Sequence, residues 1–222
     1  MTGIEWDVII PLRGSSIGAK TRLVGQDAGP GLGRAIAFAF ASDVIDVVKT
    51  NPVVAQTIVL TAHEATAAAF SESGITAVLD SDASSLNASI WTLSSQLRQA
   101  QPTRAQAVLV ADLPSLTAND FAELLNLAEQ KSFSVLCDKD KFGTCFLSCT
   151  APHVINPSFG PNSYQTHINS GFIPITPTNA KSIWTDVDTP NDLEKALRLG
   201  VGVHTAQLLA HLELLNIGDF GS

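Results

Sequence analysis

The chain has 222 residues, of which 45% are hydrophobic and 15% charged, so it can build a sizeable core and is not a disordered protein. No apolar stretch reaches the roughly 20 residues that a membrane-spanning helix needs, and the start MTGIEWD lacks the features of a signal peptide. A cytoplasmic protein is therefore expected, and the formal net charge of −8 argues against a nucleic-acid surface.

Apolar, strand-like runs alternate with helical patterns in the first 137 residues. Strands are predicted near 7–12, 56–61, 76–79, 106–111 and 132–137, and helices near 31–49, 63–73, 85–100 and 117–131. The continuous apolar run at 107–110 is typical of a strand that is covered on both faces. The order predicts an α/β fold: a Rossmann-like, doubly wound, mostly parallel sheet in a single domain spanning 1–222.

The rhythm changes near residue 143. GTCFLSC predicts another strand, the stretch NPSFGPNSYQTHINSG has no clear period, and a short strand is expected at 173–175. Asp188 or Thr189 can cap a helix that ends at Gly200. The amphipathic helix expected at 202–215 packs on the body or forms a homodimer contact.

A basic loop, PLRGSSIGAKTRL, follows the first strand at 11–23. Lys20 and Thr21 fall in the register of a phosphate-binding P-loop, but the second glycine is displaced and more glycines follow where a long helix should begin. What remains is a long cationic loop in which Arg13, Lys20 and Arg22 can neutralise a triphosphate. A solvated basic loop is the alternative.

Carboxylates occur at two places that an α/β sheet can bring together. Asp112 ends a buried strand that Pro114 stops, at the edge where open parallel sheets bind ligands. In TDVDTP, Asp186 and Asp188 share one face of an extended segment if Val187 points inward. We expect Asp112 and Asp186 to hold Mg²⁺ together with substrate phosphates, and Asp188 to cap the next helix. The alternative is that these residues serve only turns and caps.

A cationic loop, two carboxylate sites and a doubly wound sheet are the apparatus of metal-assisted phosphoryl or nucleotidyl transfer. No residue pattern supports a general base. That absence is informative if the nucleophile is a phosphate, whose second pKa of about 6 leaves it largely dianionic at neutral pH.

Five blocks in order, PLR…AKTRL, ADLPSLT, a GT-containing strand, FGPNS…H and DVDTP, carry a resemblance that runs from about residue 7 to 200. They resemble the 2-phospho-L-lactate or phosphoenolpyruvate guanylyltransferases of coenzyme F-420 biosynthesis. The resemblance implies the MobA-like, nucleotide-diphospho-sugar transferase type of fold. It also implies transfer of GMP from GTP to the phosphate of phosphoenolpyruvate or 2-phospho-L-lactate, with Mg²⁺ as cofactor and pyrophosphate as leaving group.

The same resemblance implies roles for particular residues. Those expected at the acceptor are Arg13, Thr144, Gly160 and Ser163. Those expected at the nucleotide are Gly14, Lys20, Arg22 and Asn87, with Lys20 and Arg22 acting on the triphosphate in catalysis. Those expected at the metal are Asp112 and Asp186.

Three positions depart from the family pattern. Cys145 stands where a second threonine is usual, Ala111 where a glycine precedes the metal aspartate, and Arg13 where a lysine is usual. Two other functions therefore stay open. One is a MobA-like or sugar-phosphate nucleotidyltransferase, and the other is a nucleotide-binding protein without turnover.

Overall fold

The structure is a computed structural model that describes residues 4–12, 20, 23, 30–80, 85–178 and 181–218, with residues 30 and 213–218 described by their backbone alone. No helix in these ranges is long and apolar enough to cross a membrane.

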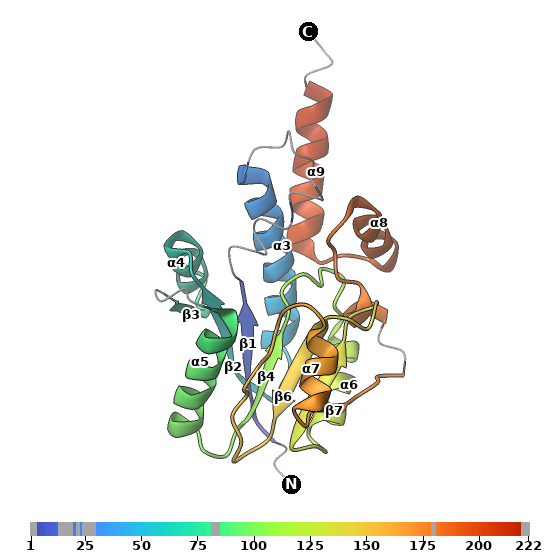
Figure 1. Cartoon of the computed structure of the whole chain (residues 1–222). Helices are drawn as coiled ribbons and strands as arrows, with labels where there is room; N and C mark the ends of the chain where they lie inside the picture. Colours follow the sequence, from blue (N-terminus) through green and yellow to red (C-terminus); the bar gives the residue numbers. More distant parts are fainter. Residues whose placement is uncertain are drawn as a thin grey trace.

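A seven-stranded sheet forms the centre, in the order β3-β2-β1-β4-β6-β5-β7 (Figure 1). Its strands are β1 (Trp6–Pro11), β2 (Val54–Thr61), β3 (Thr76–Leu79), β4 (Ala105–Leu109), β5 (Phe133–Cys137), β6 (Thr144–Cys149) and β7 (Ile173–Pro174). Strand β6 pairs antiparallel with both of its neighbours, and the other pairings are parallel. The predicted doubly wound, mostly parallel sheet is confirmed.

Helices cover both faces of this sheet, as the buried strands require. They are α3 (Pro30–Lys49), α4 (Glu64–Glu72), α5 (Leu86–Ala100), α6 (Ala118–Ala128), α7 (Ser163–Asn169), α8 (Pro190–Leu199) and α9 (Val203–Gly218), with the 3-10 turn η1 (Lys181–Trp184). In Figure 1, α5 and α7 lie in front of the sheet and α3 and α6 behind it. Strand β1 shows why: Val8 and Ile10 belong to the core under α3 and α6, and Ile9 belongs to the core under α5.

The predicted elements agree with the observed ones to within three residues at each boundary. The helix α7 and the turn η1 were not predicted, because neither is long enough to show a helical period. One local prediction is wrong. The cap of α8 is Thr189, whose hydroxyl accepts from the Asp192 N–H in a capping box, and Asp188 takes another role.

Candidate active site

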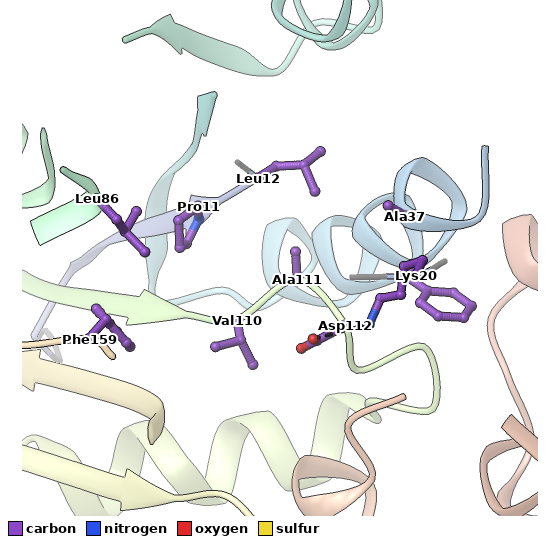
Figure 2. Close-up of a pocket in the computed structure, with 10 residues that line it drawn as sticks. Pro11, Leu12, Lys20, Ala37, Leu86, Val110, Ala111, Asp112 and Phe159 are labelled. Carbon is purple, nitrogen blue, oxygen red and sulfur yellow. Dashed lines mark hydrogen bonds and ion pairs between the residues drawn. The ribbon is translucent and has the colours of Figure 1, made fainter. Parts of the chain in front are cut away.

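A pocket opens at the carboxyl ends of β1 and β4, which are paired in parallel and therefore end at the same edge of the sheet. Figure 2 shows its lining in two parts. Apolar side chains form one end: Pro11, Leu86, Val110 and Phe159. Lys20 and Asp112 lie at the other end, next to Ala37 of α3. The pocket thus joins an apolar slot to a charged end.

The segment after β4 holds Asp112 at the charged end. The Val110 N–H donates to the Cys145 carbonyl at 3.1 Å, and Leu113 is fully buried. The Gly202 N–H donates to the Pro114 carbonyl at 2.9 Å. These anchors on both sides fix the backbone of Asp112, while its carboxylate remains partly exposed at the pocket.

The TDVDTP segment runs beside Asp112. Ser182 of η1 bonds to Asp120 of α6 at 2.6 Å between hydroxyl and carboxylate, which fixes the segment's start. Val187 is fully buried, and its N–H donates to the Asp112 carbonyl at 3.1 Å. The predicted alternation of inward and outward side chains in this segment is thus confirmed. Val187 points inward, and the aspartates on either side of it lie near Asp112.

Lys20 is buried among these carboxylates, with a relative exposure of 1%. Its Nζ lies 3.3 Å from Asp112 Oδ2 and 3.0 Å from Asp188 Oδ1, and it donates to the Val187 carbonyl. Burial lowers the pKa of this amine, but the two carboxylates outweigh burial and the pKa is raised. Lys20 was expected to face a triphosphate from a long cationic loop; in the structure it forms ion pairs with two of the three carboxylates, Asp112 and Asp188.

Asp186 is the least satisfied member of the cluster. Its Oδ1 is buried and has no hydrogen-bond partner among the described residues, while its Oδ2 lies 3.5 Å from Lys139 Nζ. Burial, reinforced by the negative charges of Asp112 and Asp188 against the positive charge of Lys139, raises the pKa of Asp186 to about 6. The unpaired Oδ1 of Asp186 is therefore free to serve as a ligand to a cation.

Lys139 was not predicted as a site residue. It lies in the hairpin between β5 and β6, 2.9 Å from Asp192 Oδ1, and it also donates to the Asp186 carbonyl at 3.3 Å. Lys139 therefore ties the hairpin to Asp186 and to the capping box of α8. A lysine in a polar turn gives no signal of this kind in the sequence.

The carboxylates fit a divalent cation that takes its other ligands from substrate. Within the described ranges, no three His, Cys, Asp or Glu side chains are placed to hold a metal by themselves. Mg²⁺ commonly uses one or two carboxylates together with phosphate oxygens, so such a cage is not required. The orphaned Asp186 Oδ1 beside Asp112 is the observation that favours the fit.

Two of the expected acceptor residues lie together in a buried polar group. Ser163 Oγ lies 3.2 Å from Thr144 Oγ1, which lies 3.0 Å from His167 Nδ1. Thr144 begins β6. Because β6 runs antiparallel to β4, this start lies at the same edge of the sheet as Asp112. His167, the histidine of the FGPNS…H block, completes the group, although the sequence assigned it no role.

Of the other predicted residues, the structure describes Asn87 and Gly160. Asn87 does not point freely at the pocket: its amide accepts from the Phe159 N–H at 2.7 Å and donates to the Phe159 carbonyl at 3.0 Å. Gly160 follows with φ +146°, a conformation that side-chain-bearing residues rarely adopt, and its carbonyl accepts from the Ser163 N–H. Arg13, Gly14 and Arg22 lie outside the described residues.

Comparisons with solved structures show the fold. A Desulfovibrio desulfuricans protein, assigned to the nucleotide-diphospho-sugar transferases, aligns with a TM-score of 0.70 at 14% identity, covering 96% of this chain and 97% of that one. A Mycobacterium tuberculosis protein in complex with manganese aligns with a TM-score of 0.53 at 16% identity, covering 89% of this chain and 100% of the other. The predicted nucleotide-diphospho-sugar transferase type of fold is confirmed.

Relatives in sequence are closer. A phosphoenolpyruvate guanylyltransferase of Streptomyces avermitilis is 32% identical over 209 residues, which cover 94% of this chain and 96% of that protein. One of Thermomonospora curvata is 31% identical over 215 residues, covering 97% and 93%. The family model described as "Guanylyl transferase CofC like" matches residues 6–217. The chain therefore belongs to the CofC-like guanylyl transferase family.

Proposed function

We propose that this protein transfers GMP from GTP to the phosphate of phosphoenolpyruvate or 2-phospho-L-lactate, as a step of coenzyme F-420 biosynthesis, with Mg²⁺ as cofactor. We take residues 1–222 as one nucleotidyltransferase domain. The observation that carries the proposal is that Asp112, Asp186 and Asp188 lie close together beside the apolar slot. The names of the relatives, phosphoenolpyruvate guanylyltransferases, support the substrates.

The two ends of the pocket suit the two ends of a nucleotide. A planar base fits between apolar walls such as Leu86 and Phe159, and its phosphates then reach the charged end at Lys20 and Asp112. The amide of Asn87 holds the Phe159 backbone from both sides, so Asn87 shapes the wall of the slot. Arg13, Gly14 and Arg22 precede or follow Lys20 closely in the chain and are assigned to the acceptor and triphosphate by the resemblance.

Asp112 and Asp186 are the residues that would hold magnesium. The bound ion would supply positive charge that offsets the charge of the reacting phosphates. Lys20, whose ammonium lies beside Asp112, would add positive charge for the triphosphate and the departing pyrophosphate.

The reaction needs positioning and charge neutralisation rather than a general base. An oxygen of the acceptor phosphate forms a bond to the α-phosphorus of GTP, the bond from that phosphorus to the β-phosphate's bridging oxygen breaks, and pyrophosphate leaves with the electron pair. The acceptor phosphate is already largely dianionic at neutral pH. Thr144 and Gly160 would place it at the edge where β6 begins, and Ser163 would hold both of them, because it donates its hydroxyl to Thr144 and its N–H to the Gly160 carbonyl.

One assay tests the proposal. The protein is given Mg²⁺ with GTP, CTP or ATP and with phosphoenolpyruvate, 2-phospho-L-lactate or a sugar phosphate, and pyrophosphate release and product mass are measured. GTP with one of the two phospho-acids is expected to react. Release only with a sugar phosphate would make the protein a different nucleotidyltransferase, and tight nucleotide binding without release from any pair would make it a binding protein.

Asp112→Asn tests the metal assignment. The change keeps the side chain's shape and leaves Lys20 its partner Asp188, so we expect a folded protein whose turnover falls at least about 100-fold. Asp140→Asn, an exposed position in the hairpin that carries Lys139, is the matched loss of one negative charge and should keep near-normal turnover. Turnover within a few-fold of normal in Asp112→Asn would remove Asp112 from the metal site.

A further inference from the structure

His167 lies wholly buried between α7 and the sheet, yet both of its ring nitrogens have polar partners. Its ring packs edge-on against Phe159 and Phe172, with centroids 5.5 Å and 5.4 Å away. The Ser158 N–H points at Nε2 with a nitrogen–nitrogen distance of 2.8 Å, and Thr144 Oγ1 lies 3.0 Å from Nδ1. A histidine in this setting has more than a space-filling role.

The contact with Ser158 fixes the tautomer. A backbone N–H can only donate, so Nε2 must be the unprotonated, accepting nitrogen. The neutral ring then carries its hydrogen on Nδ1 and donates it to Thr144 Oγ1, and it also bonds to the Ser163 backbone. Burial lowers the pKa of His167 to about 4, which is consistent with a ring that is neutral throughout the physiological range.

This tautomer determines what Thr144 can do. Its hydroxyl oxygen accepts from His167 Nδ1 and from Ser163 Oγ, which uses both lone pairs. The Thr144 hydroxyl is then left with its hydrogen alone and can only donate. A group that accepts but does not donate, such as a phosphate or carboxylate oxygen, is the ligand that suits it.

The register of the sheet places Thr144 near the proposed acceptor site. Leu109 of β4 pairs with Phe146 of β6, and the bond from Val110 N–H to the Cys145 carbonyl extends that register by one step. Thr144 thus lies beside Ala111, next to Asp112. The same histidine holds the Ser158 backbone, so the threonine and the loop that leads to Gly160 are fixed by one ring.

We propose that His167 is a positioning residue that makes the Thr144 hydroxyl an obligate donor to the anionic group of the acceptor. The inference rests on the proposed function for the identity of that acceptor. The claim that His167 orients the Thr144 hydroxyl to donate to an anion can be tested by binding measurements, without turnover.

Two substitutions separate the two nitrogens of the ring. In His167→Asn the side-chain amide can stand in for Nδ1–H and donate to Thr144, but it does not reach Ser158. In His167→Gln the longer side chain can place its carbonyl near the position of Nε2 and accept from Ser158, while the donor to Thr144 is lost. Thr144→Val removes the hydroxyl itself, and Thr166→Val, on the exposed side of α7, is a control for changes in that helix.

Acceptor and nucleotide are measured separately. Binding of phosphoenolpyruvate is followed by calorimetry in the presence of a non-hydrolysable GTP analogue, and KM is obtained for each substrate from pyrophosphate release. We expect His167→Gln and Thr144→Val to weaken phosphoenolpyruvate about tenfold or more, while KM for GTP changes less than about twofold. His167→Asn should recover most of the acceptor affinity in spite of a lower Tm.

If His167 only stabilises the loop, the variants would show a different order of acceptor affinities. His167→Asn and His167→Gln would then follow their Tm values, and both substrates would weaken together; that result would overturn the proposal. If the wild type binds phosphoenolpyruvate without turnover, the proposed function fails but the order of binding among the variants still decides this inference. If phosphoenolpyruvate is not the acceptor, inorganic phosphate is used as the probe in the same way. Unchanged phosphate affinity in His167→Gln and Thr144→Val would then contradict the proposed role of His167.

Discussion

Lys20 and Asp186 experience opposite electrostatic conditions within one cluster. The ammonium of Lys20 has two carboxylates within 3.3 Å, whereas Asp186 has two other carboxylates nearby and a buried oxygen that no described residue pairs with. The three carboxylates of Asp112, Asp186 and Asp188 thus carry more negative charge than Lys20 and Lys139 balance. A divalent metal at Asp186 would offset this excess of negative charge. Such an excess of charge is usual in a site that is built for function at some cost in stability.

Asp186→Asn should therefore stabilise the metal-free protein above pH 6. The pKa of Asp186 is raised to about 6 from 3.8, so its contribution to stability is fully present below pH 3.8 and is lost as pH rises through 6. An asparagine avoids that loss and can turn its N–H₂ toward the neighbouring carboxylate. We expect a gain of about 1–2 kcal/mol at pH 8 in chelator-treated protein, measured by urea denaturation, together with loss of turnover.

Asp188→Asn is the matched control for this prediction. It removes the same charge from the same short segment but deprives the buried Lys20 of a partner 3.0 Å away, so it should destabilise the protein. A metal-free Asp186→Asn protein that is less stable than wild type at pH 8 would show that the Asp186 carboxylate is satisfied in solution.

At the scale of elements, the approach of α9 to α3 fixes the backbone behind Asp112. Asp43 of α3 accepts from the N–H groups of His204 and Thr205 at 2.9 Å and 3.0 Å, and thereby caps α9. Gly202 sits against the same side chain and donates to Pro114, two residues after Asp112. A Cβ atom at Gly202 would lie 2.6 Å from Asp43 Cβ and 2.3 Å from its Oδ1, which leaves no room for a side chain.

Gly202→Ala is expected to lower stability by about 2 kcal/mol, because Asp43 must move and weaken its cap on α9. The Tm should fall by about 5 °C, and turnover should fall as the Pro114 backbone shifts. Gly31→Ala is the control: a Cβ there meets no atom of the described residues within 4 Å on an exposed helix turn, so it should be neutral or slightly stabilising. Equal Tm values for the two variants would mean that α9 is not held at Asp43.

Local patterns predicted most elements and part of the site, while contacts between distant elements were not accessible from sequence. Asp112 was identifiable because a buried strand ends just before Pro114, and Asp186 because it alternates with the buried Val187. The partners of Lys139 lie 47 and 53 residues further along, and nothing in its turn indicates them. Likewise, the choice of Thr189 over Asp188 as cap depends on Lys20, 168 residues away.

At the scale of the whole molecule, the reversed strand β6 joins the two halves of the site. Parallel strands β1 and β4 end at the pocket, whereas the antiparallel β6 begins there. Thr144 at the start of β6 and Asp112 beyond the end of β4 therefore reach the same edge, although one precedes its strand and the other follows it. The sequence predicted a strand at 143–149 but could not place it between β4 and β5, because strand order is set by pairings across the chain.

The stability of the whole protein should decrease at acid pH because of His167. The pKa of this histidine is lowered to about 4 in the folded protein from 6.5, so the folded state binds its proton less readily than the unfolded state. The resulting stability is present above pH 6.5 and is lost as pH falls toward 4. Compared with His167→Gln, which cannot titrate, wild type should lose about 2–3 kcal/mol more between pH 7 and pH 4, measured by urea denaturation at each pH. Parallel pH profiles for the two proteins would mean that the ring becomes protonated in the folded state, and that its bond from Ser158 and its fixed tautomer do not persist in solution.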